Sequence, residues 1–205
     1  FDHMTKPKKD IRKLNLQEIE EYLNSVGEKS FRAKQIYEWL WKKNDHKFED
    51  MTNLSKDLRS ELDQVFSIDN IRVDLMQKSD DGTIKNAVKL HDGNTVESVL
   101  IPTPTRTTAC VSSQVGCSLN CTFCATATLK RMRNLTAAEI VDQVVVIDKQ
   151  SREYFDRPLS NIVYMGMGEP MMNYNEVVKS IQIIASPDGL GMSPRRITVS
   201  TSGIP

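Results

Sequence analysis

All four cysteines of this 205-residue chain lie within a single short segment, from Cys110 to Cys124. Three of them, Cys117, Cys121 and Cys124, have the spacing C-x3-C-x2-C, and Phe123 comes directly before the last one. Cysteines this crowded argue against a disulfide framework. Thiolates are soft ligands that suit iron–sulfur clusters and zinc. The spacing therefore predicts a metal-binding loop.

The number of thiolates decides between kinds of metal site. Iron–sulfur clusters and structural zinc normally have four protein ligands, and the tight group supplies three. A four-iron cluster held by three cysteines keeps one iron open to a ligand that is not protein, and we favour this interpretation. Zinc is the main alternative, with Cys110 as fourth ligand, although zinc sites usually pair two C-x2-4-C knuckles. A buried helix face is the other, but the residues between the cysteines, such as Gly116 and Asn120, form helices poorly.

Three further segments accompany the cysteine loop in a fixed order. VSSQVGCSLNCTFCATA (111–127) is followed by KRMRNLTAAEIVDQV (130–144), MGMGEP (165–170) and STSG (200–203). C-x3-C-x-aromatic-C is the signature of the radical S-adenosylmethionine (SAM) enzymes. With the other segments, the chain resembles the RNA adenine-C2 methyltransferases of that superfamily, from about Gly27 to its last residue. The closely related adenine-C8 methyltransferases lack the proline of MGMGEP and the STSG segment.

The resemblance implies two cofactors. A [4Fe–4S] cluster would be held by Cys117, Cys121 and Cys124, and the amino and carboxylate groups of SAM would chelate its open iron. A reduced flavodoxin- or ferredoxin-type donor would supply the electron that cleaves SAM to a 5′-deoxyadenosyl radical. The expected SAM contacts are Phe123, Gly168, Glu169 and Ser200.

The resemblance also assigns two catalytic residues and the substrates. Glu97 would reach the target adenine as a proton acceptor. Cys110 would release the product by forming a disulfide with a second, methyl-carrying cysteine. Taken alone, Glu97 is an ordinary solvent-facing strand residue and Cys110 a small buried one. The implied substrates are large-subunit ribosomal RNA and transfer RNA, and we expect a cytoplasmic monomer.

Composition sets limits on these expectations. Charged residues make up 26% and hydrophobic residues 39% of the chain, which is typical of a globular protein. No apolar run approaches the roughly 18 residues of a membrane helix. The 27 basic and 27 acidic residues give no net charge, so global charge does not support an RNA partner. The local basic runs at 6–13 and 130–133 favour RNA only weakly.

Hydrophobic periodicity predicts an α/β fold in four parts. Residues 1–14 are expected to be a tag remnant and a basic tail, and residues 15–70 a small helical domain with helices at 15–26, 31–43 and 55–66. The resemblance implies that this helical domain binds RNA. Residues 71–104 alternate with period two, which predicts a short antiparallel β meander. Residues 105–205 read strand, loop and helix in turn, which predicts parallel β/α units. The resemblance implies that these units are the N-terminal half of a radical-SAM β/α barrel. Expected helix N-caps are Asn15, Ser30, Ser55, Thr136 and Asn173.

The sequence departs from the family pattern at its end. No cysteine follows Cys124, and the last predicted strand is the third of the parallel set. The methyl-carrying cysteine and the later part of the barrel are therefore not in this sequence, and we expect an inactive N-terminal fragment. Two alternative functions stay open, namely an adenine-C8 ribosomal RNA methyltransferase of the same superfamily and a non-catalytic zinc or RNA-binding module.

Overall fold

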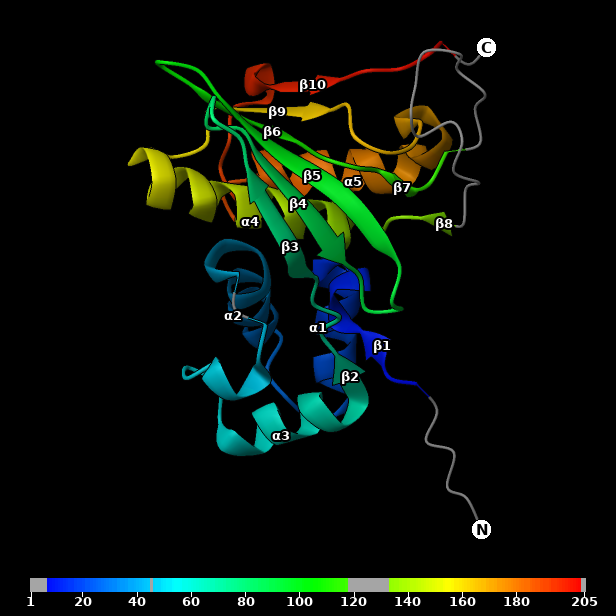
Figure 1. Ribbon diagram of the computed structural model, residues 1–205. Helices are drawn as coiled ribbons and strands as arrows, with labels where there is room; N and C mark the ends of the chain where they lie inside the picture. The colour runs from blue at the N-terminus through cyan, green and yellow to red at the C-terminus, as the bar shows by residue number, and fades with distance from the viewer. Residues whose placement is uncertain (1–6, 45, 118–132, 204–205) are drawn as a thin grey trace. The chain divides into compact units, whose positions relative to one another are not determined.

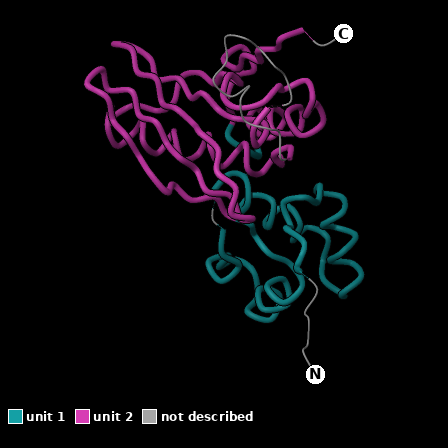
Figure 2. The backbone as a smooth tube through the Cα atoms, turned by 45° about the vertical axis from the view of Figure 1, so that its right-hand side comes forward, with its two compact units in different colours: residues 1–69, 188–190 teal, residues 70–187, 191–205 magenta. Residues whose placement is uncertain are grey.

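The computed structural model describes residues 7–44, 46–117 and 133–203. The chain divides into two compact units (Figure 2). Unit 1 comprises the residues up to Asp69 together with 188–190, and unit 2 comprises 70–187 and the residues from 191 onward. Each unit is described by itself.

Unit 1 is helical. It contains α1 (Leu16–Ser25), α2 (Arg32–Glu38), a π-helical turn (Trp39–Lys43) and α3 (Lys56–Val65), with 3-10 turns at Ile11–Lys13 and Phe48–Asp50. Two short parallel strands, β1 (Lys9–Asp10) and β2 (Phe66–Ser67), join its beginning and end. Fully buried side chains from every helix form its core, among them Ile19, Leu23, Ile36, Leu40, Trp41, Leu58 and Leu62. Periodic burial of this kind is what drives helix docking.

The stretch expected to be a basic tail is partly packed. Ile11 is 0% and Arg12 1% exposed, so both belong to the core of unit 1. The sequence predicts that a run of lysines and arginines is exposed to solvent. It does not show that the Arg12 guanidinium has buried partners. Arg12 does find them, in Asp10 and in the main-chain oxygen of Asp69.

Two of the three helix starts in unit 1 are confirmed. Asn15 and Glu18 form a reciprocal capping box, and the Ser55 side chain accepts from the Leu58 N–H. The cap at Ser30 is wrong, because α2 begins at Arg32 without a side-chain cap. Its first amides are already satisfied by main-chain carbonyls, including the bond from Ala33 N–H to Ser30 O at 2.9 Å. The Ser30 hydroxyl therefore has no free amide to accept from.

Unit 2 is a six-stranded mixed sheet in the order β10-β9-β6-β5-β4-β3 (Figure 1). Its strands are β3 (Arg72–Lys78), β4 (Ile84–Lys89), β5 (Thr95–Pro102), β6 (Thr107–Cys110), β9 (Asn161–Tyr164) and β10 (Ile197–Val199). The first four are antiparallel neighbours, whereas β6, β9 and β10 are parallel. The described residues form an open sheet and no closed barrel. The meander is continuous with the parallel strands, because β5 pairs directly with β6.

Two helices connect the parallel strands. α4 (Ala137–Phe155) joins β6 to β9, and α5 (Tyr174–Ala185) joins β9 to β10. Both lie on one side of the sheet (Figure 1). Along β5 the side chains of Val96, Ser98 and Leu100 are buried, while Glu97 and Ile101 are exposed. The sheet thus has one face covered by helices and one uncovered face among the described residues.

Candidate active site at the carboxyl ends of the parallel strands

A two-stranded ladder frames the cysteine loop. β7 (Gln114–Val115) pairs antiparallel with β8 (Arg133–Asn134), and the Gln114 amide donates to Asn134 Oδ1 at 2.8 Å. Cys117 comes two residues after β7, and its thiol is free and partly exposed. Cys121, Phe123 and Cys124 lie outside the described residues. The ladder fixes where the segment that carries the predicted ligands leaves and rejoins the fold.

Arg133 anchors this ladder to two other elements. Its guanidinium donates two hydrogen bonds to the Glu139 carboxylate of α4, at 2.7 and 2.8 Å. Its Nε donates to Asp92 Oδ2, in the turn between β4 and β5, at 2.5 Å. The hydrogen bond from Arg133 lowers the pKa of Asp92 to about 2. The pKa of Arg133 is itself raised by the hydrogen bonds to Glu139 and Asp92.

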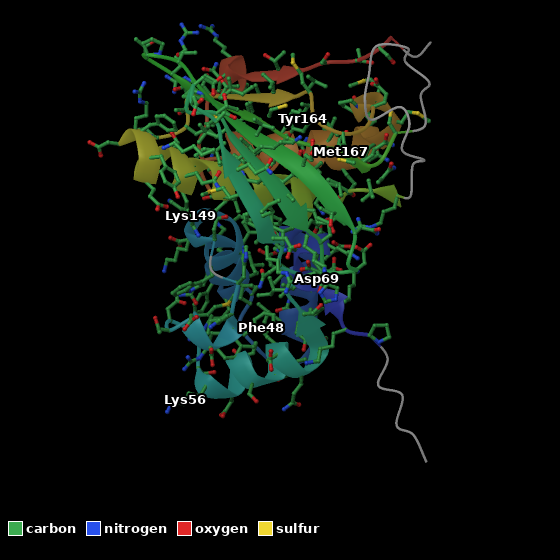
Figure 3. The ribbon with its side chains drawn as sticks, in the orientation of Figure 1. Phe48, Lys56, Asp69, Lys149, Tyr164 and Met167 are labelled. Atoms are coloured by element: carbon green, nitrogen blue, oxygen red, sulfur yellow. The ribbon has the colours of Figure 1, made fainter. Side chains whose placement is uncertain are left out.

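The MGMGEP segment follows β9, and Tyr164 and Met167 mark its course in Figure 3. A Cβ added at Gly166 would lie 2.6 Å from Ser112 Oγ, and one at Gly168 would lie 2.5 Å from the Gln114 Cβ. Gly168 also has φ +97°, which disfavours any other residue. Both glycines are therefore required for packing on residues 111–114. The SAM contact expected at Gly168 stays a prediction.

Glu169 ties the ends of β9 and β10 together. Its side chain is 4% exposed, and Oε2 accepts from the Ser202 N–H at 2.9 Å and the Ser202 hydroxyl at 3.1 Å. Oε1 accepts from the Met171 N–H at 3.0 Å. Burial acts to raise the pKa of this carboxyl, but the hydrogen bonds from Ser202, Met171 and Thr201 outweigh it, so the net pKa is lowered. Glu169 is therefore an ionised carboxylate at neutral pH.

Ser200 is the first residue after β10, and it is exposed. It therefore lies at the same edge of the sheet as Gly168 and Glu169, because β9 and β10 are parallel neighbours. Ser202 was not predicted as a site residue, although the STSG segment contains it. Its contact with Glu169 depends on which strands are neighbours.

The uncovered face of the sheet brings Glu97 and Cys110 together. Cys110 is the register partner of Val99, and Glu97 is two residues before Val99, so both point to the same side. Glu97 is 51% exposed and its Oε1 lies 2.8 Å from Lys85 Nζ. Burial raises the pKa of the Cys110 thiol, and a hydrogen bond from the Met165 main chain only partly offsets this. Cys110 is thus a protonated thiol at neutral pH.

A buried polar network supports this edge. The Gln143 amide of α4 donates to Ser112 O at 3.1 Å and accepts from Ser112 N–H at 2.9 Å. Asn173 Nδ2 donates to the carbonyls of Ser113 and Leu135, at 2.8 and 2.9 Å. Asn173 is the N-cap residue of α5, as predicted, but its side chain does not cap the helix because its amide donates to neighbouring loops instead. Thr136 and Glu139, by contrast, form the predicted capping box of α4.

Three other features are absent among the described residues, namely metal-binding side-chain groups, disulfides and membrane-spanning helices. The described residues contain no group of three or more histidine, cysteine, aspartate or glutamate side chains placed to hold a metal. Cys110 and Cys117 form no disulfide there. None of the helices described is both long and apolar enough to cross a membrane.

Comparison with known proteins identifies both halves of the chain. Residues 9–68 match the ribosomal RNA large subunit methyltransferase N-terminal domain, and residues 111–205 match the radical SAM superfamily. Residues 111–205 are therefore a radical SAM domain. The family implies a [4Fe–4S] cluster and SAM, and a loop with three thiolates supplies a donor set of the right chemistry for such a cluster.

Curated relatives are close in sequence. One from Christiangramia forsetii, named "Probable dual-specificity RNA methyltransferase RlmN", is 68% identical over 97% of this chain and 56% of its own length. One from Geotalea uraniireducens, named "Dual-specificity RNA methyltransferase RlmN", is 50% identical over 96% of the chain and 56% of its own length. The chain thus spans just over half the length of the curated relatives that it matches.

A solved structure agrees with the fold. The crystal structure of a radical SAM methyltransferase from Sphaerobacter thermophilus has a TM-score of 0.84 and 42% identity. The aligned region includes 96% of this chain and 57% of the Sphaerobacter thermophilus chain. The predicted radical-SAM fold class is confirmed by this likeness.

Proposed function

We propose that this chain supplies the N-terminal and cluster-bearing parts of an enzyme that methylates C2 of adenine in large-subunit ribosomal RNA and in transfer RNA next to the anticodon. The domain pair and the names of the relatives support RNA methylation. The observation that carries the proposal is the shared position of Glu97 and Cys110 on one uncovered sheet face. That face adjoins the edge from which the cysteine loop departs.

The strand ends supply the cofactor-binding residues in this proposal. Cys117, Cys121 and Cys124 hold the cluster, and Phe123, Gly168, Glu169 and Ser200 hold SAM. When bound, the two cofactors supply an electron and a 5′-deoxyadenosyl radical. The ionised Glu169 orients SAM through its α-ammonium group, because a buried carboxylate attracts a nearby cation strongly. Its hydrogen bonds to Ser202 also tie the segment after β10, which begins at Ser200, to the end of β9.

The uncovered face supplies the two residues that act on RNA. Glu97 accepts the proton that leaves adenine C2, and an exposed carboxylate suits contact with an incoming substrate. Cys110 forms a disulfide with a methyl-carrying cysteine outside this sequence, which breaks the covalent bond between protein and RNA. C2 of adenine is electrophilic, so ordinary transfer of a SAM methyl group does not reach it.

The partners follow from this chemistry. The proposed substrates are ribosomal and transfer RNA, and the electron comes from a reduced flavodoxin- or ferredoxin-type protein. We propose that the enzyme acts as a monomer in the cytoplasm, where thiolate ligands stay reduced.

Anaerobic reconstitution with iron and sulfide tests the cluster. We expect a brown protein with the iron content of one [4Fe–4S] cluster, and loss of that iron in Cys117→Ala. A single bound zinc and a redox-silent spectrum would overturn the radical reaction.

Nucleoside analysis tests the product. The sequence extended with the remainder of a close relative should convert adenine in transfer RNA to 2-methyladenosine, detected by mass spectrometry. 8-Methyladenosine would point instead to the related C8 reaction. Glu97→Gln and Cys110→Ala should abolish turnover while leaving the iron content unchanged.

A further inference from the structure

Unit 1 contains a cavity of about 680 Å³ that the proposed chemistry does not use. It lies between the start of the chain, the 3-10 turn at Phe48–Asp50, α3 and the segment after β2. Lys56, Arg59 and Asp63 line it with the spacing of one helix face. Leu58 and Leu62 occupy the core face of the same helix. One side of α3 therefore builds the core, and another side lines the cavity.

The cavity has an excess of positive charge, although the net charge of the surrounding domain is close to zero. Residues 8–69 contain twelve Lys and Arg and thirteen Asp and Glu. The cavity is nevertheless lined by four cations and two carboxylates; these are Lys8, Lys47, Lys56, Arg59, Glu49 and Asp63. A local excess of this kind in a nearly neutral domain indicates an anionic ligand.

Two of the cations, Lys8 and Arg59, keep their charge available. Lys8 Nζ donates to the main-chain oxygen of Asp63, and Arg59 donates to the main-chain oxygen of Glu49. Both partners are uncharged carbonyls, so they hold the side chains in place without neutralising them. The Lys47 and Glu49 side chains are 70% and 76% exposed and 3.9 Å apart, which is a weak, water-screened pair.

Lys56 shows most clearly that the positive charge of the cavity does not stabilise the fold. It is the first residue of α3, where the helix dipole disfavours a cation. Its ammonium group has no hydrogen bond or ion pair within the described part of the chain, and Figure 3 labels it at the edge of unit 1, near Phe48. A cation that costs helix stability and contacts nothing in the protein is available to a ligand.

Two buried aromatic side chains line the cavity. Phe48 is 5% and Phe66 6% exposed, and the Phe66 ring packs edge-on against Tyr22 at 4.9 Å. The volume lies in the range of sites that hold small ligands, so a single nucleotide fits.

We infer that this cavity binds the phosphodiester backbone of the RNA substrate, with Lys56 and Arg59 facing the phosphates. The inference rests on the proposed function, because it assigns the cavity to the same RNA. It excludes RNA contact at the exposed Lys34 of α2.

Salt-dependent binding to a fluorescein-labelled anticodon-stem-loop RNA tests the inference on this chain as it stands. Lys56→Gln should weaken binding by about three- to tenfold and reduce the slope of log affinity against log salt by about 0.7–0.9, the value for one lost phosphate contact. Lys34→Gln is the matched control, since it removes an exposed lysine from α2, and it should leave both quantities unchanged.

A second variant should act in the opposite direction. Glu49→Gln removes a carboxylate from the cavity, so it should tighten RNA binding by about two- to threefold. Lys56 and Glu49 are both exposed and lie outside the core. Unchanged thermal unfolding midpoints will show that the two variants fold.

The alternative outcomes are distinct. Equal weakening by Lys56→Gln and Lys34→Gln, or no RNA binding, would overturn the cavity assignment. Inorganic phosphate that displaces the RNA completely at micromolar concentration would indicate a free-anion site instead. The proposed function fails separately, if the extended protein forms no 2-methyladenosine.

Discussion

At the scale of single residues, Glu169 couples the two strand ends that carry the proposed SAM site. Glu169→Gln keeps the size of the side chain but places an uncharged amide against the Ser202 N–H and hydroxyl. Loss of charge-assisted hydrogen bonds at a buried position should lower the free energy of unfolding by about 1.5–3 kcal/mol at neutral pH. Urea unfolding measures this difference.

The pH dependence of that difference has a defined sign. The pKa of Glu169 is lowered in the folded chain from its ordinary value of 4.5. The stabilisation is therefore present above pH 4.5 and is lost as the pH falls through the lower folded pKa. The gap between Glu169→Gln and the unchanged chain should narrow in acid, and a gap that widens there would contradict the assignment.

Cys110 offers a second test at this scale. Alkylation requires the thiolate, and burial raises the pKa of Cys110. We expect iodoacetamide to modify Cys110 more slowly than a free cysteine peptide at neutral pH, with the difference disappearing in urea. Peptide mass spectrometry resolves Cys110 from the other cysteines. Equal rates in the folded and unfolded chain would show that the thiol is not protected.

Sequence reasoning placed the site residues near strand ends but missed their partners. The positions of Glu169 and Ser200 follow from short apolar strands ending in glycine and serine. The bond between Glu169 and Ser202 depends on β9 and β10 being neighbours. Local pattern does not contain that information.

At the scale of secondary-structure elements, Arg133 joins β8, α4 and the turn between β4 and β5. Arg133→Met should destabilise unit 2 by about 1.5–3 kcal/mol, because it leaves the Glu139 carboxylate, 8% exposed, without its paired donors. Hydrogen exchange at Gln114, Val115 and Asn134 should accelerate most. Arg152→Met, which removes an exposed pair within α4, is the control and should have little effect.

Acid should reproduce part of this change. The pKa of Asp92 falls from 3.8 to about 2 beside Arg133. The contribution of this pair is therefore complete above pH 3.8 and is lost as the pH falls through about 2. Asp92→Asn should remove this acid transition, and an unchanged transition would assign it to other groups.

Helix caps show where sequence rules hold at this scale. The capping boxes at Asn15 and Thr136 are local interactions within four residues, and both are confirmed. Asn173 has the same local pattern, but its amide donates to Ser113 and Leu135. Glu176, its expected partner, accepts from the Ala137 N–H of α4 instead. Tertiary contacts therefore replaced the local cap.

At the scale of the whole molecule, the alternation of strands and helices was enough to predict the parallel units. Period-two patterning likewise predicted β3, β4 and β5. What the pattern does not give is the pairing of β5 with β6, which makes the meander and the parallel strands one sheet. Unpaired strand edges are unfavourable, so a meander that can extend a neighbouring sheet does so.

Arg12 joins the first and last segments of unit 1, because it contacts both Asp10 and Asp69. The guanidinium is buried, donates to Asp69 O at 2.8 Å and lies 3.5 Å from the Asp10 carboxylate. Arg12→Met should destabilise unit 1 by about 3–5 kcal/mol, because it leaves the buried Asp10 carboxylate without its counter-charge. Peptide-resolved hydrogen exchange should show faster exchange throughout α1 and α3. Lys13→Met removes a neighbouring exposed cation and should leave the hydrogen exchange of α1 and α3 unchanged. If Arg12→Met also left that exchange unchanged, the pairing of β1 with β2 would hold the first and last segments of unit 1 together without Arg12.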